Sequence, residues 1–259
     1  MSNIHPTAII DSGAEIADGV TIGPYSVIGD GVRIGTGTEI ASHVVIKGPT
    51  VIGEKNRIFQ FSSIGDEPQD KKYAGEETRL EIGDGNTIRE YCTINRGTAQ
   101  DQGATRLGDD NWIMAYVHIA HDCTVGNDVI LANNATLAGH VHVGNHVIFG
   151  GFVGAHQFCS VGDYAFLGMY SGINRDVPPY ITISGNPGEP KGINLEGLKR
   201  RGFEKEQLRN IRNAYRVLYR SGMRLQEATD EIARLAQTQP ELEIFLNFLT
   251  HESRRSIIR

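Results

Sequence analysis

The chain is poor in the features that usually reveal a cellular address or a covalent framework. Its 259 residues include three cysteines and one tryptophan, and hydrophobic residues make up only 39%. Residues 1–28 lack the basic start and the apolar run of a secretory signal. No stretch approaches the roughly 18 consecutive apolar residues of a membrane span. We therefore expect a cytoplasmic protein with no membrane span.

The net charge of −6 conceals an asymmetry between two parts of the chain. Residues 1–190 carry 11 lysines and arginines against 22 acidic residues, whereas residues 191–259 carry 14 against 9. Such a change of sign suggests two parts with different partners. The basic part is modest and has no nucleic-acid-binding motif, so nucleic acid is not an expected partner.

Apolar residues recur at every sixth position, and this repeat dominates the sequence. A first run comprises Ile4, Ile10, Ile16, Ile22, Ile28, Ile34, Ile40, Ile46, Ile52, Ile58 and Ile64, and it resumes at Ile82, Ile88 and Ile94. Shifted by one residue, the run continues through Leu107, Ile113, Ile119, Val125, Leu131, Leu137, Val143, Phe149, Ala155, Val161, Leu167 and Ile173. A helix needs apolar residues three and four apart, so a period of six does not favour helix.

Small or β-branched residues often stand two positions before each member of these runs. Two inward positions two residues apart predict a short strand, and the glycine-rich remainder predicts a turn. Cys92, Cys123 and Cys159 all fall on this second inward position. We therefore interpret the three cysteines as reduced core residues.

Three repeats, about 18 residues, close one coil of a triangular prism of short parallel strands. The pattern resembles left-handed parallel β-helices, and the handedness is taken from that resemblance because parallel crossovers are ordinarily right-handed. We predict a mainly β protein, with a left-handed β-helix over residues 1–190 and an α-helical domain over residues 191–259. The polar segments 66–81 and 95–106 interrupt the repeat and are predicted to be loops extruded from a corner of the prism.

The repeat ends at "RDVPPY", where Pro178 and Pro179 are expected to stop it. Farther on, Leu208, Ile211, Tyr215 and Leu218 have helical spacing. Gly222 is a plausible C-cap of that helix, and Pro240 is expected to open the last one.

Histidines cluster once the coil length is applied to the sequence. Adding 18 residues to His121 gives Gly139 and then Gln157, whereas adding 18 to Asp122 gives His140. His156 is next to Gln157, and His118 lies three residues before His121, on the neighbouring predicted strand. None of these residues is on an inward position, so we expect one polar patch on the outside or at a corner of three successive coils.

Such a patch suits acyl transfer to a hydroxyl or an amine. A histidine can remove the proton of the acceptor as it attacks a thioester, so His121 is the candidate base. Asp122 could fix its tautomer, and the backbone N–H of Gly139 could donate to the oxyanion. Asp70 and Lys72 on the first loop could reach over the site.

Three other interpretations compete with this one. The patch could be a solvated polar face, or its histidines could hold zinc, as in trimeric β-helical carbonic anhydrases. The protein could also be a non-catalytic scaffold, but that would predict a flat array of threonine or serine.

Several segments together resemble one enzyme family, the UDP-N-acetylglucosamine O-acyltransferases that begin lipid A biosynthesis. They are "QDKKYAGE", "TINRGT", "HIAHDCTVGN", "LANNATLAGHV", "HQFC", "DVPPY" and "NLEGLKRRGF". The resemblance covers essentially the whole chain. It implies a homotrimer with active sites between neighbouring prisms, an (R)-3-hydroxyacyl donor on acyl carrier protein, and the 3-position of UDP-N-acetylglucosamine as acceptor. It implies no metal and no cofactor.

The resemblance also assigns roles to residues. It makes His121 the base, Asp122 its support and the Gly139 amide the oxyanion donor. The substrate-binding residues that it implies are Asp70, Lys72, His118, His140, His156, Gln157, Asn194, Glu196, Arg200 and Arg201. Asn95, in "TINRGT", departs from the histidine that many members have there, but an amide can still donate a hydrogen bond.

Two features leave the substrate open in part. The family includes members that acylate a 3-amino sugar, and a coenzyme A-dependent sugar acetyltransferase of the same fold is an alternative. Met169 is expected to limit the acyl groove, which predicts a donor nearer ten or twelve carbons than fourteen.

Four arginines follow one helix face: Arg209, Arg212, Arg216 and Arg220. They form either an ordinary solvated stripe or a docking surface for the acidic carrier protein.

Overall fold

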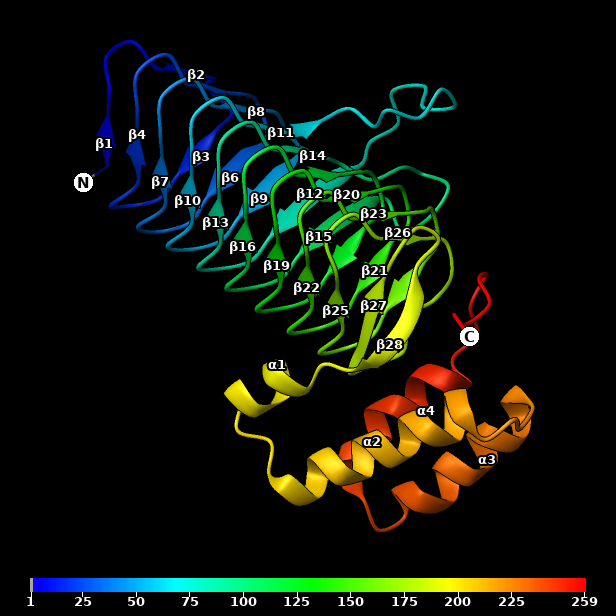
Figure 1. Cartoon of the computed structure of the whole chain (residues 1–259). Helices are drawn as coiled ribbons and strands as arrows, with labels where there is room; N and C mark the ends of the chain where they lie inside the picture. Colours follow the sequence, from blue (N-terminus) through cyan, green and yellow to red (C-terminus); the bar gives the residue numbers. More distant parts are fainter. Residues whose placement is uncertain (1) are drawn as a thin grey trace.

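The computed structural model describes residues 2–259. Residues 3–193 form a prism with three flat faces (Figure 1). Face A is an 11-stranded sheet, in spatial order β1 (Asn3–Ile4), β4 (Thr21–Ile22), β7 (Glu39–Ile40), β10 (Arg57–Ile58), β13 (Thr87–Ile88), β16 (Trp112–Ile113), β19 (Ile130–Leu131), β22 (Ile148–Phe149), β25 (Phe166–Leu167), β27 (Ile181–Ser184) and β28 (Glu189–Ile193). Face B has nine strands, β2 (Ile9–Ile10), β5 (Val27–Ile28), β8 (Val45–Ile46), β11 (Ser63–Asp66), β14 (Thr93–Asn95), β17 (His118–Ile119), β20 (Thr136–Leu137), β23 (Gly154–Ala155) and β26 (Gly172–Ile173). Face C has eight, β3 (Glu15–Ile16), β6 (Val32–Ile34), β9 (Thr50–Ile52), β12 (Arg79–Ile82), β15 (Ala104–Leu107), β18 (Thr124–Val125), β21 (His142–Val143) and β24 (Ser160–Val161).

The six-residue repeat sets the register of every face. On face A, Ile22 pairs with Ile40, Ile40 with Ile58, and Ile58 with Ile88, so each apolar position stacks on its counterpart one coil away. From Ile22 onward the members of the repeat are buried, and together they form the core of the prism. Ile4 in the first coil is 38% exposed, because no earlier coil covers it. The prediction of a left-handed parallel β-helix is confirmed.

The corners depend less on glycine than the sequence suggested. Among residues 2–259, seventeen residues other than glycine have positive φ, and most of them lie at corners, including Tyr91 and Tyr116. The rings of these two tyrosines stack with centroids 4.9 Å apart. Stacking of equivalent side chains from coil to coil offsets the local cost of the left-handed conformation.

The cysteines lie where the repeat predicts them. Cys92, Cys123 and Cys159 are buried free thiols. Burial raises the pKa of Cys92 and Cys159 to about 11 and that of Cys123 to about 12, so all three are protonated and unreactive near neutrality.

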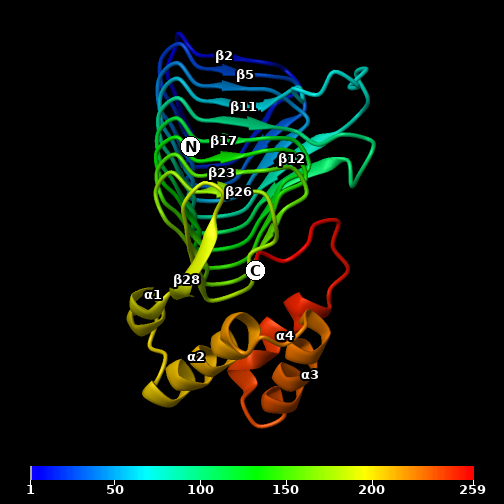
Figure 2. The same cartoon turned by 45° about the vertical axis from the view of Figure 1, so that its right-hand side comes forward.

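Both extruded loops leave the prism at the same corner, the one between faces B and C (Figure 2). The first connects β11 to β12 and the second connects β14 to β15. They are tied at their bases, because Asn95 Nδ2 donates to Glu67 O at 2.8 Å and Arg96 Nη2 donates to Tyr73 Oη at 2.9 Å. The segment that carries Asp70 is therefore held beside the "TINRGT" segment.

The expectation that the repeat stops at Pro178 and Pro179 is wrong. Val177 pairs in parallel with Val161, and β27 adds a further parallel strand to face A. The two prolines fall at the corner between these elements, where the parallel ladder does not require their missing N–H. β28 then pairs antiparallel with β27 and closes the prism, spanning the expected domain boundary at residue 190.

The C-terminal part is helical and packs below the last coils (Figure 1). It contains α1 (Leu195–Arg200), α2 (Lys205–Arg220), α3 (Leu225–Ala236), the 3₁₀ turn η1 (Pro240–Leu242) and α4 (Glu243–Thr250). As predicted, α2 buries Leu208, Ile211, Tyr215 and Leu218. Gly222 follows α2 with φ of 77°, and Pro240 opens η1, which leads into α4. Among the helices of residues 2–259, none has the length and apolarity of a membrane span.

Candidate active site

The predicted patch gathers at the corner between faces B and C, which we call the histidine corner. His121 and Asp122 form the turn between β17 and β18. The next coils stack directly beneath, because the His140 N–H donates to His121 O at 3.0 Å and the Phe158 N–H donates to Gly139 O at 3.2 Å. The corner thus holds residues of three coils, as the 18-residue spacing predicts.

The central pair of this corner consists of His121 and Asp122. Nδ1 of His121 lies 2.9 Å from Oδ2 of Asp122. An ionised carboxylate only accepts hydrogen bonds, so Nδ1 carries the proton and Nε2 presents a lone pair. The sequence predicted this pair on the outside or at a corner of the prism. The pair lies at a corner, and His121 and Asp122 are only 6% and 3% exposed. The second loop covers them.

The second loop also holds the carboxylate of Asp122. The Thr98 N–H donates to Oδ1 at 2.9 Å, and Thr98 Oγ1 donates to Oδ2 at 2.6 Å. Burial alone would raise the pKa of Asp122, but the hydrogen bonds from His121 and Thr98 outweigh it and hold that pKa below its ordinary value. Asp122 is therefore ionised near neutrality and suited to stabilise an imidazolium.

A second histidine–aspartate pair lies beside the first. Nδ1 of His140 is 2.7 Å from Oδ2 of Asp101, a residue of the second loop, and 3.8 Å from Oδ2 of Asp122. The rings of His121 and His140 meet edge to face with centroids 5.1 Å apart. Sequence reasoning missed Thr98 and Asp101, because the fold of a 12-residue loop outside the repeat has no periodic signal.

Gly139 approaches the imidazole of His121 closely. A Cβ atom at this position would lie 2.5 Å from Cε1 and 2.7 Å from Nε2 of His121, so only glycine fits beside the ring. Within residues 2–259, the N–H of Gly139 donates no hydrogen bond. A free donor therefore lies next to the basic nitrogen, as an oxyanion site requires.

His118 lies on β17 with its ring directed out of face B. Its Nδ1 is 2.7 Å from Thr93 Oγ1, which fixes the ring. Burial, and then the neighbouring His121, lower the pKa of His118 below its ordinary value. This histidine is neutral near pH 7 and can hydrogen-bond a substrate.

His156 and Gln157 lie one coil below Gly139 and are both exposed. They contact the end of the chain: Arg255 Nη2 is 2.7 Å from Nδ1 of His156, and Arg255 Nε donates to Gln157 O at 3.0 Å. No sequence pattern indicated this contact, which joins residues 99 positions apart.

A metal site is the competing use of this corner. Potential ligand atoms of His121, Asp122 and His140 lie within 4.8 Å of one another. However, Nδ1 of each histidine faces a carboxylate, and both oxygens of Asp122 already accept hydrogen bonds. The donor set is satisfied as a hydrogen-bonded network, which favours acid–base chemistry over metal binding.

Other predicted site residues are not joined to the corner within one chain. Asp70 and Lys72 belong to the first loop at the same corner, where the Lys72 N–H donates to Asp70 Oδ1 at 3.0 Å. Within residues 2–259, neither makes a hydrogen bond or ion pair with the histidines. Met169 is 60% exposed but lies at the corner between faces A and B.

Four of the predicted substrate-binding residues lie in α1 or at its ends. Asn194 caps this helix and donates from Nδ2 to Tyr164 O at 2.9 Å. Glu196 pairs with Lys199, whereas Arg200 is exposed. Arg201 Nη1 donates to Asp128 Oδ2 at 2.6 Å, and Asp128 belongs to the corner between faces C and A. In one chain, face C separates this group from the histidine corner.

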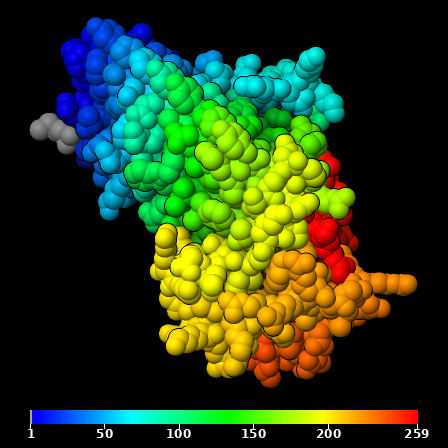
Figure 3. Space-filling model, in the orientation of Figure 1, coloured from blue at the N-terminus to red at the C-terminus, as the bar shows by residue number. Residues whose placement is uncertain are grey.

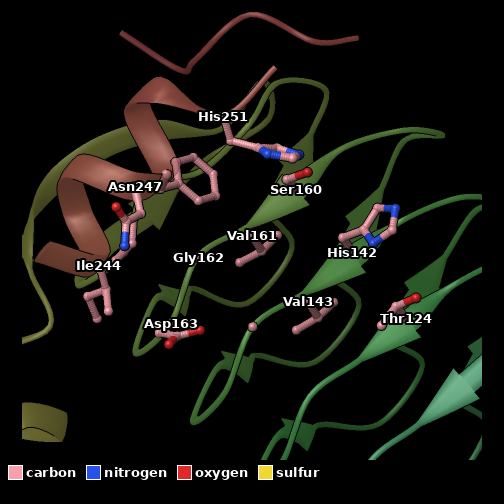
Figure 4. A pocket seen from close by; sticks show the side chains of 13 residues that line it. Thr124, His142, Val143, Ser160, Val161, Gly162, Asp163, Ile244, Asn247 and His251 are labelled. Atoms are coloured by element: carbon pink, nitrogen blue, oxygen red, sulfur yellow. The ribbon is translucent and has the colours of Figure 1, made fainter. Parts of the chain in front are cut away.

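Two adjoining cavities run along face C from the histidine corner. The smaller, about 190 Å³, is bounded by Asp101, His140 and Phe158. The larger, about 470 Å³, lies between face C and α4 (Figure 4). His142, Ser160 and His251 line both, so the cavities form one groove. Burial lowers the pKa of His142, which favours the neutral form of this side chain.

Comparison with known proteins identifies the family of this chain. Residues 176–258 match the family model described as UDP N-acetylglucosamine O-acyltransferase, domain 2, and residues 2–36, 13–48 and 104–139 match the bacterial transferase hexapeptide model. Proteins named acyl-(acyl-carrier-protein)–UDP-N-acetylglucosamine O-acyltransferase from Thiobacillus denitrificans and Neisseria gonorrhoeae are 56% and 55% identical over 259 residues, all of this chain and of theirs. The solved UDP-N-acetylglucosamine O-acyltransferase of Moraxella catarrhalis is 51% identical, with a TM-score of 0.97 over 99% of both chains. The chain therefore belongs to the UDP-N-acetylglucosamine O-acyltransferase family.

Proposed function

We propose that this enzyme transfers an (R)-3-hydroxyacyl group from acyl carrier protein to the 3-hydroxyl of UDP-N-acetylglucosamine, the first step of lipid A biosynthesis. The observation that carries the proposal is the buried His121–Asp122 pair beside the free N–H of Gly139. The names of full-length relatives at more than half identity support the choice of substrates. The same proposal places the reaction in the cytoplasm.

The chemistry follows from the tautomer of His121. Its Nε2 lone pair takes the proton of the acceptor hydroxyl while that oxygen attacks the thioester carbonyl. Asp122 stabilises the imidazolium, and the Gly139 N–H donates to the tetrahedral oxyanion. When the intermediate collapses, the C–S bond breaks and the imidazolium returns its proton to the thiolate. An ester and a free carrier thiol result.

The active form is proposed to be a homotrimer. The histidine corner, the group around α1 and Met169 occupy three different corners of one chain, so one chain does not gather them. A closed ring of three prisms brings the corner of one chain against a different corner of its neighbour. Asn194, Glu196, Arg200 and Arg201 of one chain would then hold the nucleotide beside His121 of another, with Arg supplying bidentate contacts to diphosphate.

Around the reacting atoms, the remaining predicted residues are proposed to bind substrate. His118, His140, His156 and Gln157 surround His121, whereas Asp70 and Lys72 on the first loop would contact the acyl hydroxyl or the sugar. The glucosamine 3-hydroxyl is preferred as acceptor over a 3-amino group because the relatives named above are O-acyltransferases.

Incubation with UDP-N-acetylglucosamine and a panel of 3-hydroxyacyl carrier proteins and coenzyme A thioesters tests the reaction. Acyl-UDP-N-acetylglucosamine should form from the carrier-bound donors. Turnover confined to acetyl-coenzyme A, or product formed only with the 3-amino sugar, would contradict the proposal.

Mixed assemblies test the shared site. His121→Ala and Arg201→Ala chains are each expected to be nearly inactive, but refolding them together should restore about a quarter of wild-type activity, since random mixing leaves that share of interfaces intact. No recovery on mixing, with trimers confirmed by mass, would contradict a site built from two chains.

A further inference from the structure

The last nine residues form a strap that returns from the helical part to the prism, seen in red beside the later coils in Figure 3. The Asp176 N–H donates to Ser256 O at 3.0 Å, and the Ile258 N–H donates to Asp176 O at 2.8 Å. Ile258 is buried, and Arg259 Nε donates to Leu218 O at 3.0 Å. The strap is therefore fixed both to the prism and to α2.

Two arginines of the strap reach the histidine corner. The guanidinium of Arg254 lies 4.6 Å from the ring centroid of Phe158, and that ring stacks on His140 at 4.4 Å. This cation–π contact anchors the strap at the corner. Arg255 contacts the backbone of Gln157 and the imidazole of His156.

The Arg255–His156 contact determines the tautomer of the histidine. A guanidinium only donates hydrogen bonds, so Nδ1 of His156, 2.7 Å from Arg255 Nη2, must accept. The same Nδ1 lies 3.3 Å from Gln157 O, which would instead require a proton on Nδ1. The shorter contact prevails, since Gln157 O already accepts from Arg255 Nε. A neutral His156 then carries its proton on Nε2.

We propose that Arg255 is a positioning residue that fixes His156 as an Nε2–H donor toward a substrate oxygen, which makes the C-terminal strap part of the active site. The substrate part rests on the function proposed above. The assignment gives two histidines of one corner opposite tautomers: His121 presents a lone pair on Nε2 as base, whereas His156 presents a hydrogen. Asp122 sets the tautomer of His121, and Arg255 sets the tautomer of His156.

Nitrogen NMR of protein labelled with ¹⁵N-histidine tests the tautomer without turnover. The His156 signals, assigned by their loss in His156→Gln, should show a protonated Nε2 and an unprotonated Nδ1. Arg255→Ala should change this pattern, and Arg255→Lys should preserve it because an ammonium also donates. A protonated Nδ1 in the wild type, or an unchanged pattern in Arg255→Ala, would overturn the inference.

Kinetics test the consequence for catalysis. Arg255→Ala should lower kcat/KM about tenfold, Arg255→Lys should recover part of the loss, and Arg255→Ala should cost nothing further in His156→Ala. Arg259→Ala is the comparator, because it removes contacts of the strap that lie away from the histidine corner. It should lower Tm, but its effect on kcat/KM should not depend on whether His156 is present. Additive losses in the double variant would overturn the positioning role while leaving acyl transfer intact. A wild type that forms no acyl-UDP-N-acetylglucosamine would contradict the proposed function, and the NMR result would still decide the tautomer.

Discussion

The backbone of Gly139 lies so close to His121 that a Cβ atom there would come within 2.5 Å of the imidazole Cε1. The two residues belong to successive coils at one corner, and the carbonyl of His121 accepts a hydrogen bond from the residue after Gly139. The candidate base and the candidate oxyanion donor are therefore held by the stacking of the prism itself.

Gly139→Ala should displace the imidazole of His121 while leaving the fold intact. Misplacement of a catalytic group by about 1 Å costs on the order of 10²-fold in rate, so we expect kcat to fall by about that factor. Gly154→Ala is the control, because a Cβ there meets no atom within 4 Å. Equal kcat in both variants would contradict the proposed geometry.

His121→Ala should remove the general base. The expected loss of kcat is about 10²–10⁴-fold, measured with saturating donor and acceptor while Tm and oligomeric state are followed. His43→Ala is the control, since His43 is also a corner histidine but stacks between Tyr25 and Phe61, away from the histidine corner. A His121→Ala variant with more than about a tenth of wild-type kcat would exclude the role of base.

Thr98→Val should weaken the hold on the Asp122 carboxylate. The pKa of Asp122 is held below its ordinary value in the native state, so its stabilisation is present above the unfolded pKa of about 3.9 and is lost as pH falls through the native pKa. We expect the variant to lose about 1–3 kcal/mol of unfolding free energy at pH 7. The difference from wild type should shrink below about pH 4.

Urea unfolding of wild type and variant at pH 7 and at pH 3.5 checks this prediction. Thr136→Val is the control, because the hydroxyl of Thr136 is exposed and contacts only Asn134 O at 3.4 Å. A loss that is the same at pH 7 and pH 3.5 would mean that Thr98 acts through packing and not through the carboxylate.

Met169→Gly should shift the preferred donor toward longer acyl chains. Met169 is 60% exposed at the corner between faces A and B, where a neighbouring chain could bring it to the acyl groove. Each additional buried methylene is worth roughly 0.8 kcal/mol, about fourfold in kcat/KM. Assays with C10, C12 and C14 donors should show the wild type preferring C10 or C12 and the variant preferring C14, with Met223→Gly unchanged. An unaltered preference would exclude Met169 as the determinant of chain length.

Reversing the charge of Arg212 and Arg216 should weaken docking of the acidic carrier protein. Both are exposed on α2, and Arg209 of the same stripe is paired with Glu206. KM for the carrier-bound donor should rise several-fold and depend less on salt. Arg33→Glu with Arg57→Glu makes the same change of net charge on the early coils and should leave KM unchanged. An unaltered KM at low salt in the Arg212/Arg216 variant would mean that the stripe is only solvated.

The sequence alone determined the prism and the composition of its corner. A period of six with two inward positions predicts a triangular prism of short parallel strands, whereas its left hand came from the resemblance to known β-helices. Adding 18 residues to His121 identifies Gly139 before any coordinates exist, because every coil repeats the same turn. The free cysteines and the buried face of α2 followed from the same reasoning. These features depend on local repetition, which a sequence records directly.

Only the tertiary structure decided which other residues contact the histidine corner. Thr98 and Asp101 come from a loop outside the repeat, and Arg255 comes from a strap 99 residues beyond the histidine that it contacts. The continuation of the prism past Pro178 and Pro179 also required coordinates, because a proline at a corner and a proline in a strand look alike in sequence. Contacts between segments without a common period are set by packing in three dimensions, so no spacing in the chain predicts them.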